Sequence, residues 1–320
     1  MRVCVLLATY NGEKYLEEQL LSLKNQNDVN VSLLVSDDGS TDRTISILKK
    51  YNNIRRENFK IISILKNQTH TNENFNNAHH SKLASMASDN FCNLIKNADS
   101  SFDYYAFSDQ DDIWHNDKLK RAISVMNETR KPVLYCSSSN LVDERGQFTM
   151  KSPIRKVEPS FENALAQSLA AGNTMVMNNA AFLLLKKSIK ELSIPAHDWW
   201  TYILISGAGG RVIYDSTAKI DYRIHDNNIT GTNYNFIQFM KRLIVAMRGN
   251  YKNWNKLNCE ALQNNLEILN ERSTKVLKLF MKARKSSVFY RNYYLLKSGV
   301  FREQFHQKIL MHIGILFNKI

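Results

Sequence analysis

Acidic side chains are concentrated in the tetrapeptide Asp109-Gln110-Asp111-Asp112, which lies at the end of the apolar run "DYYAFS". Three carboxylates in four residues repel one another unless a cation or solvent neutralises them. Carboxylate oxygens suit Mg²⁺ or Mn²⁺, which retain water molecules and commonly share their coordination with substrate phosphates. The cluster therefore predicts a divalent metal site. The alternative interpretation is a solvated acidic loop that caps the following helix.

Two further polar clusters also end apolar runs. Thr9-Tyr10-Asn11 closes the run at 3–9, and Asp37-Asp38 follows the run at 31–36. In an open α/β sheet, ligands bind in the crevice at the carboxyl ends of the strands. We therefore expect the three clusters to line one crevice, although Asp37 or Asp38 could instead form an Asx turn before a helix.

Strand-like and helix-like patterns alternate through the first half of the chain. Leu16, Leu20 and Leu23 are spaced as on one face of a helix. This alternation is typical of βαβ units, so the fold class is predicted to be α/β with a mostly parallel sheet flanked by helices. The short runs "TMVMN", "GRVIYD" and "AKIDYRIH" predict mixed strands at the edge of that sheet. The longer predicted strands are 3–9, 31–36, 60–66, 103–109 and 131–139.

Several classes of protein are excluded by what the 320 residues contain. The chain is 43% hydrophobic and 23% charged, which is ordinary globular usage and excludes long disorder. It has neither G-x-G-x-x-G nor G-x-x-x-x-G-K-[ST], so a dinucleotide oxidoreductase or P-loop NTPase is not expected. Its four cysteines form no CxxC pair, which excludes a zinc ribbon and fits a reducing cytosol. No export signal or membrane span is recognisable, so a soluble or peripheral protein is expected.

The excess of basic over acidic residues is confined to the last quarter of the chain. Residues 1–234 hold 27 Lys and Arg against 26 Asp and Glu, whereas residues 235–320 hold 16 against 4. Basic amphipathic helices bind anionic membrane surfaces, which is one interpretation of this tail. The other is that its apolar stripes pack on the rest of the protein. No aromatic-basic RNA motif is present, so nucleic acid is not an expected partner. The two stripes are Phe236, Phe239, Met240, Leu243, Ile244 and Met247, and Ile309, Leu310, Ile313, Leu316 and Phe317.

The motifs together resemble a known enzyme family. "ATYNGEKYLEEQLLSLKNQ", "VSDDGSTDRT" and "FSDQDDIWHNDKL", in this order, are similar to family 2 of the inverting glycosyltransferases, which have the GT-A fold. The later segments "AGNT", "AHDWW" and "YRIHDNNITG" are similar to the rhamnosyltransferase-like branch. The resemblance is firm over about residues 2–231.

The resemblance implies a role for each matching residue. Thr9 and Asp38 would hold a pyrimidine base, with Tyr10, Asn11 and Asp37 beside them. Asp109 and Asp111 would be the two acids of a DxD motif and, with His225, the metal set for Mg²⁺ or Mn²⁺. Of the two acids, Asp109 would lie near the ribose and Asp111 would ligate the metal, with Asp112 as their neighbour. His225 would face the metal or the diphosphate. Asp198 occupies the position of the catalytic base, and the acceptor side would be lined by Gly172, Asn173, Thr174 and Trp199.

Some of these residues have a second interpretation. Asp198 could only cap the helix that starts at "WWTYILIS", because Asp is a favoured N-cap. Trp199 and Trp200 could belong to the core rather than to a sugar-stacking surface. The segment "KNQTHTNENFNNAHH" departs from the glycine-containing loop of the family, so no base-contacting residue is assigned there.

The expected protein is a metal-dependent inverting glycosyltransferase. It would move a sugar, with rhamnose favoured by branch similarity, from a UDP- or dTDP-linked donor to a lipid-linked saccharide in O-antigen or capsule synthesis. The domains would be a catalytic 1–234, divided near 115 into nucleotide-sugar and acceptor halves, and a basic helical 235–320. The enzyme would lie on the inner face of a bacterial cytoplasmic membrane. The alternative function is a non-catalytic module that binds a nucleotide or an anionic membrane. A nucleotidyltransferase would need a Gly/Arg-rich phosphate loop, which "ATYNGEKY" is not.

Overall fold

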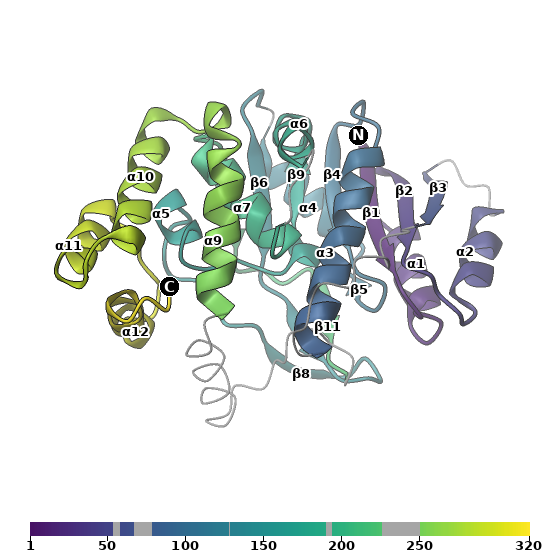
Figure 1. Ribbon diagram of the computed structural model, residues 1–320. Helices are drawn as coiled ribbons and strands as arrows, with labels where there is room; N and C mark the ends of the chain where they lie inside the picture. The colour runs from purple at the N-terminus through teal and green to yellow at the C-terminus, as the bar shows by residue number, and fades with distance from the viewer. Residues whose placement is uncertain (54–57, 67–78, 128, 190–193, 226–249) are drawn as a thin grey trace.

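The computed structural model describes residues 1–53, 58–66, 79–127, 129–189, 194–225 and 250–320. A seven-stranded sheet with the order β10-β6-β9-β4-β1-β2-β3 forms its centre (Figure 1). The five longer predicted strands are all confirmed. The strands are β1 (Arg2–Thr9), β2 (Asn30–Asp37), β3 (Phe59–Lys66), β4 (Tyr104–Ser108), β6 (Val133–Ser137), β9 (Val176–Asn178) and β10 (Arg211–Asp215).

The sheet is mostly parallel, as predicted, but its mixed strand is not at an edge. β1 pairs in parallel with β2 and β4, and β6 pairs in parallel with β10. β9 runs antiparallel between β4 and β6, inside the sheet. The expectation of mixed edge strands was therefore wrong for β9. All three of its residues are buried, as expected for a strand inside a sheet.

A second, four-stranded sheet was not predicted. It has the order β5-β11-β7-β8 and places β11 between β5 and β7. β5 has only two residues, too few for any periodic signal in the sequence. It follows Asp112 directly, so this sheet brings the acidic loop against β11. The four strands are β5 (Ile113–Trp114), β7 (Asn140–Val142), β8 (Phe148–Lys151) and β11 (Ile220–Arg223).

Helices cover both faces of the central sheet, because its strands are apolar on both sides. On β1, Val3, Val5 and Leu7 join one core cluster, whereas Cys4 and Leu6 join the other. The first cluster includes side chains of α1 (Leu16–Lys24), α2 (Thr44–Asn52) and α4 (Lys118–Met126). The second includes side chains of α3 (His79–Asn97), α5 (Phe161–Ala164), α6 (Asn179–Ser188) and α7 (His197–Gly207).

The C-terminal helices share the second core cluster. Leu262, Leu277 and Phe280 are buried in it together with the side chains of α7. Figure 1 shows most of these helices at the end of the molecule away from β3. These helices therefore pack on the α/β region through side chains that lie outside the two predicted stripes. These helices are α9 (Asn250–Gln263), α10 (Glu271–Lys285), α11 (Val288–Ser298) and α12 (Phe305–Leu316).

The two predicted apolar stripes have different outcomes. The stripe from Phe236 to Met247 lies outside the described residues. On α12, Met311 and Ile315 face the core, whereas Ile309 and Ile313 are exposed. Among the described helices, none has both the length and the apolar character needed to cross a bilayer.

Candidate active site

The ends of β1 and β2 are joined by the carboxylate of Asp37. It accepts hydrogen bonds from the backbone N–H groups of Gly39 and Ser40, at 3.1 and 2.8 Å, and from the Thr9 hydroxyl at 2.8 Å. The Asp38 N–H donates to the Thr9 carbonyl at 2.9 Å. Asp37 thus forms the turn that was its alternative interpretation, and the Thr9 hydroxyl is already engaged. Asp38 is buried beside them.

A side-chain clip joins the end of β1 to the acidic loop after β4. The Gln110 carbonyl oxygen accepts from the Tyr10 N–H at 2.9 Å, and its amide donates to the Tyr10 carbonyl at 2.8 Å. Gly12 is required for this approach, because a Cβ there would lie 2.2 Å from Gln110 Oε1. Sequence reasoning assigned no role to Gln110, although it lies inside the acidic motif. The clip holds two of the three predicted clusters together.

Asp111 and His225 meet across 114 residues of sequence. The Asp111 carboxylate lies 2.9 Å from His225 Nε2, and both side chains are largely shielded from solvent. The imidazole stacks on the Tyr15 ring, with 5.3 Å between centroids. The structure therefore brings into contact two of the three residues, Asp111 and His225, that the resemblance had assigned to the metal.

Arg223, two residues before His225, is fully buried and was missed by sequence reasoning. Its guanidinium donates to the carbonyls of Asp111 and Glu144, at 3.0 and 2.8 Å, and pairs with the Glu18 carboxylate. It also lies over the Tyr15 ring, at 4.6 Å. Arg223 thereby fixes the backbone of the acidic loop on β11. The motif "YRIH" contained the signal, because a cation beside the predicted ligand His225 was available to bind a carboxylate loop.

Asp109 lies where several negative charges meet. Burial, Asp111 and Asp198 together raise the pKa of its carboxyl to about 7, while the Lys118 ammonium opposes the rise. A carboxylate in this position is stabilised by any cation that arrives nearby. Asp111 and Asp198 are therefore both close enough to Asp109 for their charges to act on it.

Asp112 is fully buried and serves a different purpose from its neighbours. It accepts from the Asn173 amide at 2.5 Å and from the Arg223 N–H at 3.4 Å. Lys118, also buried, donates to the Asn173 carbonyl at 2.5 Å and lies over the Trp114 ring. Burial raises the pKa of Asp112 and lowers that of Lys118, whereas their mutual attraction opposes the fall for Lys118. Asp112 thus supports the site from inside.

The predicted acceptor residues point largely into the protein. Asn173 and Thr174 are buried in the 3₁₀ helix η2 (Gly172–Thr174), Asn173 against Asp112 and Thr174 against the Ala171 carbonyl. Trp199 is buried and its ring N–H donates to the Ala164 carbonyl at 2.7 Å, so it belongs to the core as its alternative interpretation held. Gly172 packs against the start of α7, where a Cβ on it would lie 2.5 Å from His197 Nε2 and 3.4 Å from Asp198 Cβ.

Asp198 lies in the first turn of α7. The N-cap is Ala196, so Asp198 is not the capping residue, and its carboxylate accepts from the Trp199 N–H at 2.6 Å. Burial raises the pKa of Asp198 to about 6, although backbone N–H groups oppose the rise. Next to it, His197 stacks on Phe91 with 3.8 Å between centroids, and burial lowers its pKa to about 3. His197 is therefore neutral, which leaves Asp198 as the titrating group of this turn.

Comparison with known proteins decides the family. Residues 4–79 match the family model described as Glycosyl transferase family 2. Over 246 residues the chain is 33% identical to the dTDP-rhamnosyl transferase RfbG of Shigella flexneri, which covers 74% of this chain and 78% of that protein. The chain belongs to glycosyltransferase family 2. The sequence-based assignment of this enzyme class is therefore confirmed.

Two further similarities agree with this glycosyltransferase family. Over 136 residues, or 42% of the chain and 20% of the relative, it is 31% identical to the poly(ribitol-phosphate) β-N-acetylglucosaminyltransferase TarS of Staphylococcus aureus. The crystal structure of S. aureus TarS 1–349 with UDP-GlcNAc superimposes with a TM-score of 0.53 at 18% identity, covering 93% of this chain and 89% of that one. The likeness confirms the GT-A fold.

Two side chains that could hold a metal ion lie together in this glycosyltransferase. In the part of the chain that the structure describes, no three His, Cys, Asp or Glu side chains are grouped as a complete ligand set. The 2.9 Å between Asp111 Oδ2 and His225 Nε2 nevertheless matches two adjacent ligands of an octahedral cation, which at ~2.1 Å from the metal lie about 3 Å apart. Mg²⁺ commonly takes one or two protein ligands and completes its shell with phosphate oxygens and water. The residues present fit such a shared cation.

Replacing Asp112 with Ala should destabilise the fold. The carboxyl oxygens of Asp112 accept hydrogen bonds from two buried N–H groups, and a methyl group would accept none. Both donors would lose their acceptor, so the free energy of unfolding in urea should fall by about 1–3 kcal/mol. Asp117→Ala, which breaks a half-exposed ion pair with Lys219, is the control and should cost less than about 1 kcal/mol. Equal losses in the two variants would contradict the structural role of Asp112.

Proposed function

We propose that this glycosyltransferase transfers a hexose, with inversion, from a dTDP- or UDP-linked donor to a hydroxyl of a lipid-linked saccharide. The proposal rests on the contact between Asp111 and His225, and on Asp109 nearby, whose pKa is raised by burial and by the charges of Asp111 and Asp198. RfbG is named as a dTDP-rhamnosyl transferase, which favours rhamnose, and the TarS complex contains UDP-GlcNAc, which keeps other hexoses open. O-antigen or capsule synthesis at the inner face of the cytoplasmic membrane is the proposed setting.

The acceptor hydroxyl is activated by Asp198. A hydroxyl is a poor nucleophile, and a carboxylate within hydrogen-bond reach can take its proton as the new bond forms. Burial raises the pKa of Asp198 to about 6, which makes it a stronger base than an exposed carboxylate yet leaves it ionised at neutral pH. One base and one direct displacement at the anomeric carbon give inversion.

Asp111 and His225 are the side chains proposed to face the diphosphate leaving group. A divalent cation held by these two side chains would supply Lewis-acid stabilisation of the charge that develops on the diphosphate. Asp109 adds negative charge beside that position, and a bound cation would lower its pKa. Arg223 and the Gln110 clip keep the loop that carries Asp109 and Asp111 in place.

The nucleoside would lie over the ends of β1 and β2. Tyr10 is 42% exposed there, whereas Asp37 and Thr9 are buried and engaged with each other. We therefore assign Asp37 and the Thr9 hydroxyl to the shape of the pocket. Asp38 and the exposed Tyr10 and Asn11 are the residues proposed to face the base.

A donor screen tests the proposed reaction. The enzyme is incubated with Mn²⁺, a lipid-diphosphate saccharide and each of a panel of nucleotide sugars, and product is followed by mass spectrometry. We expect turnover with a pyrimidine nucleotide sugar, and with dTDP-rhamnose above the others. Nucleotide binding without turnover of any donor would instead support the non-catalytic module.

Asp111→Asn should weaken nucleotide binding only when a divalent metal is present. Without the carboxylate, binding of dTDP or UDP measured by calorimetry should weaken at least about tenfold in Mn²⁺. In excess EDTA the variant and the native enzyme should bind alike. Asp103→Asn, before β4 at the opposite edge of the sheet, is the control and should behave as the native enzyme. Full transfer activity of the native enzyme in EDTA would contradict the metal assignment.

Asp198→Asn should remove the proton acceptor while keeping the size of the side chain. We expect kcat to fall by ~10²–10⁴-fold, with nucleotide binding unchanged. The base must be ionised, so kcat/KM of the native enzyme should be constant above pH 6 to 7 and decrease as the pH falls through the Asp198 pKa of about 6. That acidic limb should be absent from the residual activity of the variant. A variant that keeps both the rate and the limb would return Asp198 to a structural role.

A further inference from the structure

The last two helices expose large apolar side chains in regular rows. On α11, Phe289 is 88% and Leu296 is 69% exposed, with Tyr293 between them at the i+4 position. On α12, Phe305 and Phe317 are 78% and 71% exposed. Ile309 and Ile313 lie between them, so this row has a spacing of four. Helix faces that meet water normally carry polar residues at such positions. We call these seven residues the apolar rows.

The opposite sides of both helices are already packed. Leu295 of α11 and Met311 and Ile315 of α12 are buried in the common core cluster. The Arg291 side chain donates to the Leu316 carbonyl at 2.7 Å and so joins α11 to the end of α12. The apolar rows are therefore left over after the helices have docked.

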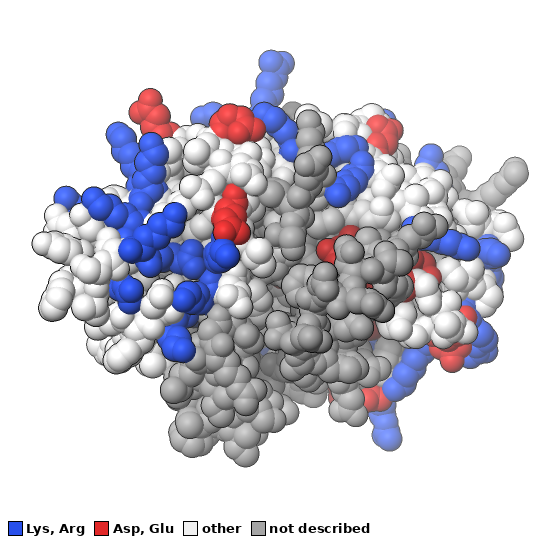
Figure 2. All heavy atoms as spheres, in the orientation of Figure 1, with Lys and Arg blue, Asp and Glu red and all other residues white. Residues whose placement is uncertain are grey.

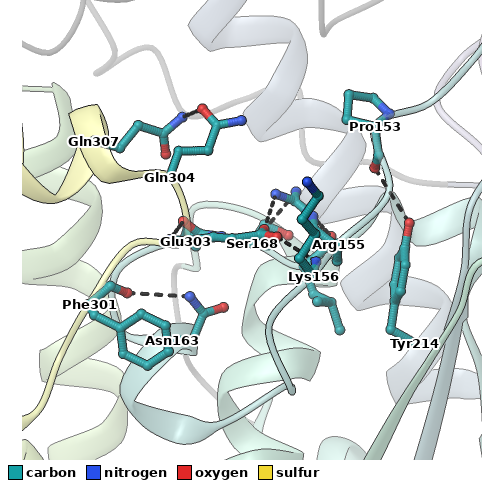
Figure 3. Close-up of polar contacts among 12 residues, drawn as sticks. Pro153, Arg155, Lys156, Asn163, Ser168, Tyr214, Phe301, Glu303, Gln304 and Gln307 are labelled. Carbon is teal, nitrogen blue, oxygen red and sulfur yellow. Dashed lines mark hydrogen bonds and ion pairs between the residues drawn. The ribbon is translucent and has the colours of Figure 1, made fainter.

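Polar contacts fix the start of α12 to the body of the protein. The Glu303 carboxylate accepts from the Lys156 N–H at 2.6 Å and pairs with Arg155 at 3.3 Å, and the Asn163 amide donates to the Phe301 carbonyl (Figure 3). Arg155 also donates to the carbonyls of Ser168 and Leu169. The support beneath the apolar rows is therefore held by several independent hydrogen bonds.

Positive charge adjoins the apolar rows. Residues 271–320 contain 11 Lys and Arg and only two acidic residues, and one of these, Glu303, is engaged with Arg155. Figure 2 shows Lys and Arg gathered over α10, next to a largely uncharged area over α11 and α12. The exposed cations of this surface include Lys275, Lys278, Lys282, Lys285, Lys297 and Lys308.

We propose that the apolar rows and the adjoining lysines bind an anionic lipid bilayer peripherally. Lysine attracts anionic headgroups, and aromatic and aliphatic side chains insert at the headgroup–acyl boundary. In a dimer formed through this surface, residues 271–320 of two copies would face each other. Each copy has nine more basic than acidic residues in this segment, and their repulsion opposes self-association. The inference rests on the proposed function, because it names the surface that would hold the enzyme at a lipid-linked acceptor.

Vesicle sedimentation tests the surface with the full chain, without donor or acceptor. Vesicles of phosphatidylcholine alone are compared with an equal mixture of phosphatidylcholine and phosphatidylglycerol. We expect strong binding only to the mixed vesicles at 0.1 M salt and substantial release at 1 M, where the screening length falls from ~10 to ~3 Å. Absence of binding to the mixed vesicles at 0.1 M salt, or equal binding to neutral vesicles, would overturn the proposal.

Paired variants separate the two contributions. Phe289→Ser with Phe317→Ser should lower binding at least about tenfold at both salt concentrations, because salt does not screen apolar insertion. Lys275→Gln, Lys278→Gln and Lys282→Gln together should lower it on the order of 100-fold at low salt only, at about fivefold per charge. The controls are Phe148→Ser with Leu21→Ser, and Lys49→Gln with Lys60→Gln and Lys96→Gln, which change exposed residues elsewhere and should bind within about twofold of the native protein.

Two further measurements distinguish competing outcomes. If analytical ultracentrifugation shows a dimer that Phe289→Ser abolishes, the rows form a protein interface and the lipid proposal fails. Hydrolysis of the sugar nucleotide by water, measured without lipid, reports on the proposed function alone. A protein that binds vesicles but lacks this hydrolysis and all transfer retains the membrane surface while losing the proposed function, and the reverse result has the opposite meaning.

Discussion

Negative charge gathered at the carboxyl edge of the central sheet is the constraint on which the rest of the site depends. Asp109, Asp111 and Asp112 come from the loop after β4 and Asp198 from α7, and each needs its own compensation. Asp112 has the Asn173 amide and the nearby Lys118 ammonium, Asp111 has His225, and Asp198 has backbone N–H groups at the start of α7. Burial and the charges of Asp111 and Asp198 raise the pKa of Asp109 to about 7. A site left in this condition is suited to a cationic ligand.

The second sheet joins the acidic loop to the segment that carries His225. β11 lies between β5, which continues the acidic loop, and β7. Arg223 at its end contacts Asp111, Glu144 and Glu18, which are distant from it in sequence. A buried guanidinium with several fixed acceptors is costly to move, because each broken hydrogen bond leaves a desolvated group. The position of His225 is therefore determined by the same interactions that hold the acidic loop.

Local patterns were sufficient to predict much of this protein. Apolar runs of the right length gave β1, β2, β3, β4 and β6, because strands buried on both faces need continuous apolar sequence. The resemblance of three motifs, in their order along the chain, to a known family was sufficient to predict the enzyme family. The amphipathic spacing on α12 indicated a helix but not its orientation. Met311 and Ile315 pack while the Ile309 row is exposed, since the packed face depends on the neighbours that a helix meets.

The sequence by itself determined which chemical groups gather at the site, because residues at the carboxyl ends of parallel strands meet at one edge of the sheet. Which carboxylate does what was decided only by the tertiary structure. Asp111 and Asp112 are adjacent in the chain, yet one meets His225 and the other is buried against Asn173. Asn173 and Trp199 likewise turned inward. The hydrogen-bond partners of Asp111, Asp112 and Trp199 lie 114, 61 and 35 residues away in the chain, and no local pattern records which segments will be in contact.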